Sequence, residues 1–176
     1  MRRLSVCLLA LAAFLVLPQN GQAHTAKRKL SAIEAHRTAT WRWQRLMGAP
    51  LTPTTYSERG GKGIRHLDWL EELWARRARA ARRKAFRVPR ARAWRCIMRY
   101  ESDPAQRWRT HTGNGYYGGL QMDLGFQHRY GRHLLRHKGT ADRWTPLEQM
   151  WVAERAYRAG RGFYPWPNSA RACGLI

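Results

Sequence analysis

Two features that lie close together in the sequence have the residue types that acid catalysis on a sugar chain would need. Glu101 is a single carboxylate at the end of the apolar, Trp-bearing stretch 91–103, and the glycine-rich stretch THTGNGYYGGLQMD follows at 110–123. Partial burial disfavours the charged form of a carboxyl group and raises its pKa. A glutamate at such a position can therefore hold a proton near neutral pH and donate it as a general acid.

The glycine-rich stretch predicts an irregular β-hairpin, because its glycines favour turns over a helix. Glycine lets backbone amides and carbonyls approach a ligand closely, while Tyr116 and Tyr117 offer flat faces and hydroxyl groups that suit a sugar chain. Two simpler interpretations stay open from these residues alone. The stretch could be a tight turn with two core aromatics, and Glu101 could be a surface residue or half of an ion pair.

The elements that must position these residues are mainly helices. In SAIE, Ser31 can bond the amide of Glu34 while the Glu34 side chain bonds back, which predicts a helix that starts there. It is expected to end near Met47, where a glycine and a proline follow. The Pro- and Gly-rich residues 48–64 are expected to form a loop.

A second helix is predicted over 65–86, with one apolar face formed by Leu67, Leu70, Leu73 and Trp74. Its acidic residues lie in the first half and its basic residues in the second, which suits the helix dipole. This basic helix could bind an anionic polymer, or it could simply be the solvated face of a helical hairpin. Further helices are predicted over 91–103 and 124–137, and from the N-cap Thr145, with Pro146 and Glu148 in its first turn, to Gly160.

The whole chain of 176 residues carries a formal net charge of +22. A surplus of this size favours a polyanionic partner, which could be nucleic acid, anionic lipid or an anionic cell-wall polymer. Residues 1–23 resemble a secretory signal peptide, with a positive start, a short apolar run and a small-residue end before His24. A retained membrane anchor is the alternative. Secretion disfavours nucleic acid and predicts an extracellular, wall-associated protein without stable membrane insertion.

Removal of residues 1–23 leaves two cysteines, Cys96 and Cys173, which in a secreted chain are expected to form a disulfide. A metal site would need more ligands at tighter spacing, and no histidine cluster supplies them. We therefore expect neither a metal nor another cofactor.

Three sequence stretches form one distinctive pattern: AWRCIMRYES, HTGNGYYGGLQM, and EQMWVAERAYRAGRGFYPWP followed by CG, which together cover about residues 91–174. This pattern resembles the resuscitation-promoting-factor family of transglycosylase-like domains, within the lysozyme-like superfamily. The resemblance implies an α+β, mainly α fold, with a small lysozyme-like domain and a Gly-rich β-hairpin at 91–176. The basic helical hairpin expected at 24–90 lies outside the resemblance and rests on the helix patterns described above.

The resemblance also implies an activity, which is cleavage of the β-1,4 bond between N-acetylmuramic acid and N-acetylglucosamine in peptidoglycan, for wall remodelling or resuscitation. Glu101 occupies the position of the catalytic acid, and Gln121 that of a substrate-contacting glutamine. The other residues expected to contact glycan are Thr112, Asn114, Tyr116 and Tyr117.

Two departures from the family pattern concern the disulfide and the helix end. Tyr100 stands where the family has a cysteine, whereas Cys96 lies one helical turn earlier and Cys173 is also displaced. The two shifts can compensate each other. Asp103 replaces a common glycine, so the end of the helix is expected to differ.

A single acid suits a lytic mechanism, in which the 6-hydroxyl of the sugar closes a 1,6-anhydro ring, while attack by water would give a hydrolase. Asp103 and Asp123 are possible second carboxylates, although structural roles are the stronger expectation for both. Two other classes of function stay open: a non-catalytic cationic wall-binding protein, and a cationic membrane-active protein with helix 65–86 as its effector.

Overall fold

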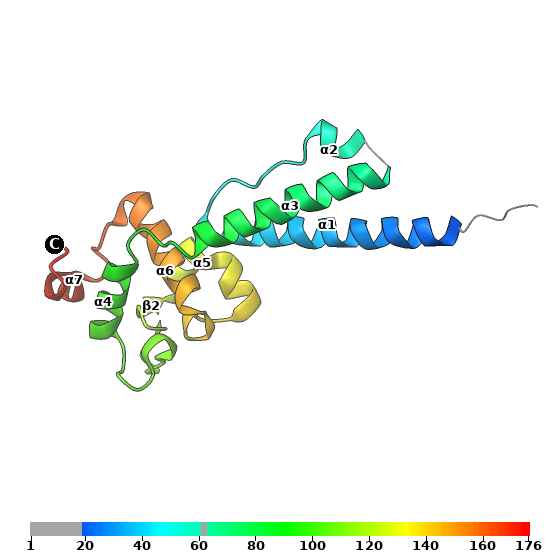
Figure 1. Ribbon diagram of the computed structural model, residues 1–176. Coiled ribbons are helices and arrows are strands. Elements are labelled where there is room, and N and C mark those ends of the chain that lie inside the picture. Colours follow the sequence, from blue (N-terminus) through cyan, green and yellow to red (C-terminus); the bar gives the residue numbers. More distant parts are fainter. Residues whose placement is uncertain (1–18, 61–62) are drawn as a thin grey trace, which may run out of the picture.

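A long helical arm extends from one side of a smaller, mainly helical body in the computed structural model of this protein (Figure 1). The structure describes residues 19–60 and 63–176. Residues 1–18 of the predicted signal peptide lie outside the described residues, and the signal peptide stays a prediction. Among the described residues, no helix is long and apolar enough to cross a membrane.

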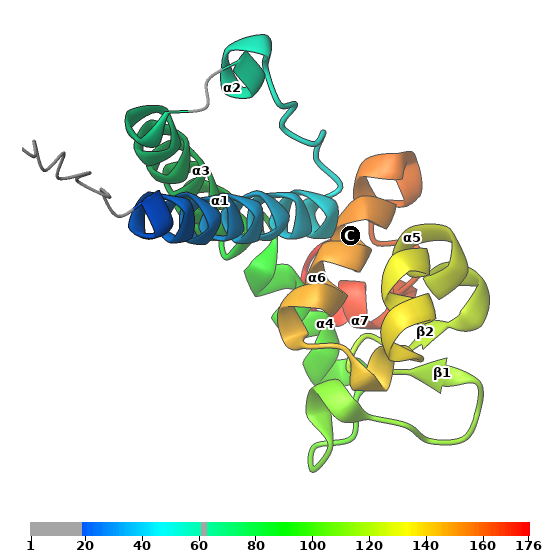
Figure 2. The same ribbon diagram turned by 90° about the vertical axis from the view of Figure 1, so that its right-hand side faces the viewer.

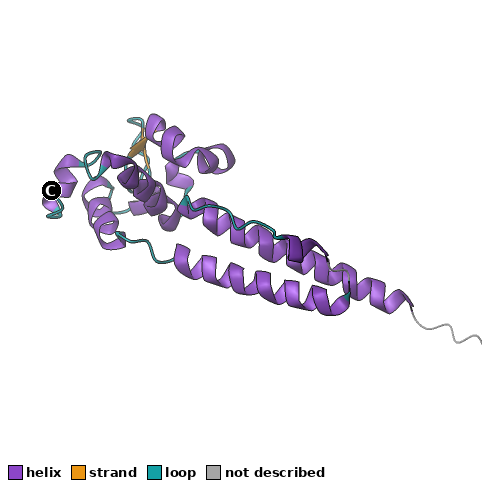
Figure 3. Ribbon diagram, turned by 90° about the horizontal axis from the view of Figure 1, so that it is seen from above, coloured by secondary structure: helices purple, strands orange, loops and turns teal. Residues whose placement is uncertain are grey.

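The arm consists of α1 (Gln19–Met47), the short helix α2 (Tyr56–Gly60) and α3 (Ile64–Ala85). Helices α1 and α3 lie side by side (Figure 3). Contacts from Lys29 to Asp68 and from Trp41 to Trp74 show that both run in the same direction. Because these two basic helices are parallel, the chain has to run back along the arm between them. Residues 48–63, called the return segment below, make this connection in place of a short hairpin turn.

The predicted start of the first helix at Ser31 is wrong, because α1 is already helical from Gln19. Glu34 does not cap the helix but pairs with Arg37 and accepts a hydrogen bond from Thr38. Upstream residues pack against α3, and Lys29 pairs with Asp68 and Glu71, so tertiary contacts extend the helix beyond its local start signal.

Glu58 fastens the return segment to α3. Its side chain accepts hydrogen bonds from Trp74 Nε1 and Arg77 Nη1, both at 2.9 Å, and from Thr55 Oγ1 at 3.1 Å. Burial by itself would raise the pKa of Glu58, but the bonds from Arg77 and Thr55 outweigh burial and bring the pKa below 4.5. The expected loop 48–64 therefore contains a helix with a buried, charge-paired carboxylate.

The body contains the remaining helices: α4 (Ala91–Glu101), α5 (Leu124–Lys138), α6 (Pro146–Ala156) and α7 (Pro167–Ala172). The predicted capping box of α6 is present, with Thr145 and Glu148 bonded reciprocally. A π-helical turn follows at Tyr157–Arg161, where Gly160 has a φ of +87°. Helix 124–137 is confirmed almost to the residue, whereas α7 was not predicted.

The sheet is small, as expected for an α+β, mainly α domain. Strands β1 (Tyr116–Tyr117) and β2 (Met122–Asp123) pair antiparallel beside the start of α5 (Figure 2). Tyr116 lies opposite Asp123, and Tyr117 opposite Met122. The Gly-rich stretch is therefore an irregular β-hairpin.

The arm and the body share one hydrophobic core. Met47, Ala85 and Val88 belong to the same buried cluster as Trp94 and Trp151. Trp151 Nε1 donates to the Ala85 carbonyl at 2.7 Å. The Arg155 guanidinium bridges the carbonyls of Leu46 and Tyr130. The ends of both arm helices are thus fixed to the domain that carries the candidate site.

Candidate active site

Glu101 is the last residue of α4, and its half-buried side chain faces α7. Trp94, Ile97 and Met98 precede it on the same side of α4 and are buried in the core. Ser169 of α7 donates its hydroxyl to Glu101 Oε1. Within the described part of the chain, this is the hydrogen bond that orients the Glu101 carboxylate.

Ser169 is a residue of the candidate site that the sequence did not reveal. The Trp166-Pro167 pair favours a short helix with proline in its first turn, which is what α7 has. That signal could have predicted the helix. It could not have predicted the contact with Glu101, because the two residues are 68 positions apart.

The disulfide Cys96–Cys173 joins α4 to the residue that follows α7, with the two Cα atoms 6.0 Å apart. The predicted pairing is therefore present in the structure, even though Cys96 lies a turn earlier than the family pattern expects. The bridge holds α7 against α4. It thereby keeps Ser169 beside Glu101.

Two glycines of the hairpin are required by close packing. A Cβ on Gly119 would lie 2.7 Å from Met98 Cγ and 2.9 Å from Trp108 Cα. Gly118 has a φ of +75°, and a Cβ there would lie 2.6 Å from Gln149 Oε1. Besides the ligand access predicted for them, these glycines let the hairpin pack on α4 and α6.

Gln149 of α6 is the buried polar residue that organises the hairpin. Its Oε1 accepts from the Gly119 amide at 2.9 Å, and its Nε2 donates to the carbonyls of Trp108 and Ala141 at 2.7 and 2.8 Å. The side chain is fully buried, so each bond replaces water. Gln149 was another residue that the sequence did not reveal.

Gln121 follows the turn of the hairpin and adopts a φ of +45°, which is unusual for a residue with a side chain. Its Nε2 donates to the Gly118 carbonyl at 2.8 Å. Trp166 Nε1 donates to the neighbouring Leu120 carbonyl at 2.6 Å. Segment 166–169 therefore touches both the hairpin next to Gln121 and the carboxylate of Glu101.

The other predicted glycan contacts lie on the first limb of the hairpin. Thr112, Asn114 and Tyr116 are exposed, and Tyr117 is half-buried and stacks on His111 with ring centres 5.0 Å apart. Asn114 Oδ1 accepts from the Tyr116 amide at 3.1 Å, which stabilises the turn. Exposed rings and amides of this kind can contact a sugar chain, but their role in binding stays a prediction.

Both candidate second carboxylates bind backbone amides. Asp103 accepts from the amides of Ala105 and Gln106 at 2.7 and 3.0 Å and shapes the chain after α4. Asp123 caps α5 by accepting from the Phe126 amide at 2.7 Å. These bonds give each aspartate a structural role, as the sequence favoured.

A basic pocket of about 690 Å³ opens on a neighbouring face of α4. Arg95, Arg99 and Arg107 line it, together with Met98 and Trp108. Arg107 has a φ of +51°, which holds the backbone in a left-handed conformation there. Three guanidinium groups around one cavity can bind carboxylates. Among the described residues, no cluster of His, Cys, Asp and Glu could hold a metal ion.

Known proteins that resemble this chain match the same region. Residues 88–169 fit the family model of the transglycosylase-like domain. The resuscitation-promoting factor Rpf1 of Corynebacterium glutamicum is 38% identical over 68 residues, which are 39% of this chain and 34% of that protein. No solved structure matches.

Residues 88–169 therefore resemble the transglycosylase-like domain family, as the sequence predicted. Glu101, Ser169 and the Gly-rich hairpin all fall inside the matched segment. The match spans about a third of the length of this curated relative.

Proposed function

We propose that this protein cleaves the β-1,4 bond between N-acetylmuramic acid and N-acetylglucosamine in peptidoglycan, with Glu101 as its single acid. The observation that carries this proposal is the Glu101–Ser169 hydrogen bond inside the transglycosylase-like segment. Both nearby aspartates are bonded to backbone amides, which favours a mechanism with one carboxylate.

In this mechanism Glu101 protonates the oxygen of the leaving sugar. Ser169 holds Oε1 by donating to it, so the acidic proton is carried on Oε2 and can be aimed at the glycosidic oxygen. The N-acetyl group of the substrate stabilises the positive charge that develops on the sugar. Glu101 then accepts a proton from the 6-hydroxyl, which closes a 1,6-anhydro ring, or from water, which gives hydrolysis.

The hairpin residues Thr112, Asn114, Tyr116, Tyr117 and Gln121 would hold the glycan beside Glu101. The basic pocket next to α4 would accept carboxylate groups that peptidoglycan carries. The charge of the arm would bind anionic polymers of the wall, and the signal-like residues 1–23 would direct the protein outside the cell. The role of wall remodelling or resuscitation rests on the family resemblance.

The decisive experiment digests purified walls with residues 24–176 and identifies the released muropeptides by mass. Anhydro ends identify a lytic enzyme and reducing ends a hydrolase. General acid–base catalysis typically accelerates a reaction by about 10²–10⁴-fold. We therefore expect Glu101→Gln to lower the rate of muropeptide release by at least about 10²-fold. Wall binding should persist, because the hairpin is unchanged.

Asp123→Asn is the matched control, since asparagine also caps helices well. We expect this variant to keep activity within about threefold of the wild type if Asp123 acts only as a cap. If Glu101→Gln releases muropeptides as fast as the wild type, the proposed enzyme activity is wrong. A non-catalytic wall-binding protein would then explain the fold and the charge.

A further inference from the structure

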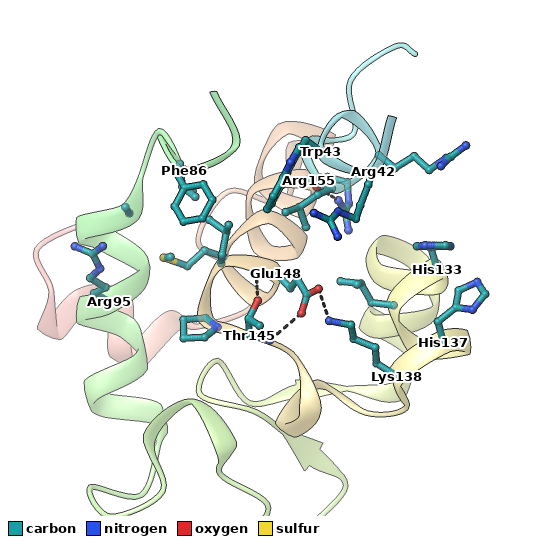
Figure 4. A pocket seen from close by; sticks show the side chains of 18 residues that line it. Arg42, Trp43, Phe86, Arg95, His133, His137, Lys138, Thr145, Glu148 and Arg155 are labelled. Carbon is teal, nitrogen blue, oxygen red and sulfur yellow. Dashed lines mark hydrogen bonds and ion pairs between the residues drawn. The ribbon is translucent and has the colours of Figure 1, made fainter. Parts of the chain in front are cut away.

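A second pocket, also of about 690 Å³, lies where the arm joins the body. Figure 4 shows it between the end of α1 with Arg42 and Trp43, Phe86 after α3, and His133, His137 and Lys138 of α5. Residues from the start of α6, including Thr145 and Glu148, form its base. None of the residues that line it belongs to the hairpin or contacts Glu101.

Apolar side chains form most of this junction pocket. Leu46, Val88, Leu134, Leu147 and Met150 line its inner surface. Trp43 and Phe86 add an aromatic wall, with ring centres 5.6 Å apart, and Phe86 is 57% exposed. A concave apolar surface that water can reach is a favourable place for an aliphatic chain, because the chain would displace that water.

Basic side chains surround the apolar surface. Arg42, Arg45, Arg95, His133, His137, Lys138 and Arg155 line the pocket, and Glu148 is the acid among them. Lys138 pairs with Glu148 at 2.6 Å, while Arg155 bonds backbone carbonyls. Within the described residues, Arg42, Arg45 and Arg95 form no ion pair with an acid. Arg42 instead stacks over the Trp43 ring, 4.8 Å from its centre.

The unbalanced charge affects the neighbouring histidine. Burial lowers the pKa of His133, and the positive charges of His137, Arg45, Arg136 and Arg155 lower it further. An anion bound here would relieve this repulsion. The pocket therefore combines an apolar interior with a positive potential at its edge.

We propose that the junction pocket binds an anionic amphiphile, with one aliphatic chain in the apolar interior and a phosphate or carboxylate head at Arg42 and Arg45. An inorganic anion would leave the aromatic wall unused, and a neutral sugar would leave the positive charge of the pocket uncompensated. The volume is in the range of sites that enclose a single small molecule. The ligand is therefore one amphiphile molecule and not a bilayer surface.

The direct test titrates residues 24–176 with dodecyl phosphate below its micelle concentration, by calorimetry. We expect one molecule bound per chain. A neutral dodecyl glycoside should bind at least about tenfold more weakly, because it lacks charge-assisted hydrogen bonds. Inorganic phosphate alone should give no saturable binding in the same range.

Two double variants locate the head group. Arg42→Gln with Arg45→Gln should weaken dodecyl phosphate by about tenfold or more, since both neutralise the proposed partner charges. Arg79→Gln with Arg83→Gln removes the same charge from exposed positions of α3 outside the pocket, and should leave the affinity unchanged. Both pairs lie on the surface, so the fold should persist, and circular dichroism verifies it.

Several results would overturn the proposal. Equal losses of affinity for dodecyl phosphate in the two double variants would mean that the protein attracts the anion unspecifically through its net charge. Equal binding of the glycoside would mean an apolar pocket without a head-group site. Tighter binding of an acidic amphipathic peptide than of any amphiphile would identify a peptide groove, and binding to anionic vesicles but not to monomeric dodecyl phosphate would identify a membrane surface. Muropeptide release is measured separately, so failure here leaves the Glu101 proposal untouched.

Discussion

Ser169 donates its hydroxyl hydrogen to one oxygen of the Glu101 carboxylate, and this fixes the direction in which the other oxygen points. The serine itself is almost fully buried, at 5% exposure. If Glu101 is the acid, as proposed above, a hydroxyl buried this deeply would act as a positioning group, because it is shielded from the substrate. Its loss should therefore slow the reaction more than it weakens substrate binding.

We expect Ser169→Ala to lower kcat by about tenfold and to change KM little. A tenfold loss corresponds to about the free energy of one hydrogen bond to a charged group. Initial rates of muropeptide release at several wall concentrations would separate the two constants. Ser102→Ala is the matched control, since Ser102 donates to the Met98 carbonyl instead of the Glu101 carboxylate. Equal losses in both variants would show that Ser169 acts only through the stability of the fold.

Glu101 could be predicted as the candidate acid because a carboxylate at the end of an apolar helix, beside a Gly-rich turn, is an unusual pattern. Its catalytic role stays a prediction. Ser169 and Gln149 could not be predicted, because their roles depend on which distant segments meet. Gly118 and Gly119 show the same limit of prediction from sequence. A glycine indicates that a side chain is not tolerated at that position. The reason, close contact with Gln149, Met98 and Trp108, is visible only in the structure.

The helices were predictable where local signals and packing agree. Thr145 and Glu148 form the predicted capping box, and α3 follows its apolar pattern. The start of α1 was missed because contacts with α3 overrode the local signal at Ser31. Helix α7 was missed because a six-residue helix is stabilised mainly by what it packs against, here α4 and the disulfide.

The Cys96–Cys173 bridge should make α7 a stable part of the site. It spans 77 positions, and the chain-entropy model gives about 4.5 kcal/mol for a loop of that length, as an upper value. We expect Cys173→Ser, compared with the oxidised wild type, to unfold at lower urea concentration and to release fewer muropeptides. A thiol count near two per chain in oxidised residues 24–176 would contradict the bridge.

Glu58 predicts how acid affects the arm. Its pKa in the folded protein is below the ordinary value of 4.5, so the folded state binds this proton less readily than the unfolded chain does. The stabilisation is complete above pH 4.5 and is lost as the pH falls through the lower, folded value. Urea midpoints between pH 7 and 3 should fall less steeply for Glu58→Gln, which has no such proton to bind. A parallel fall in both proteins would contradict this prediction.

The arm and the body act as one folded unit. Met47, Ala85 and Val88 lie in the body's core, and Trp151 and Arg155 bond the ends of both arm helices. Deletion of residues 24–90 would therefore expose buried surface of the body and would not test the arm alone. The proposed binding of a polymer by the arm is therefore better tested by substitutions on its outer surface.

Charge on the outer surface of α3 should control how the protein is retained on walls. Among the described residues, the exposed basic side chains of α3 and of the segment just after it that form no ion pair include Arg79, Arg83, Lys84 and Arg87. Exposed charges are screened over about 10 Å at 0.1 M salt, so retention should fall steadily as salt rises. Replacing these four residues by glutamine should weaken retention at low salt and flatten its dependence on salt, while the arm keeps its core contacts.

The matched control replaces four exposed arginines of the body by glutamine: Arg129, Arg132, Arg136 and Arg161. Both variants lose the same net charge, so a difference between them reports position and not total charge. We expect the α3 variant to lose clearly more retention, measured as the fraction of protein that sediments with purified walls at each salt concentration. If the two variants have the same salt slope, the arm has no special role, because attraction would then depend on total charge alone.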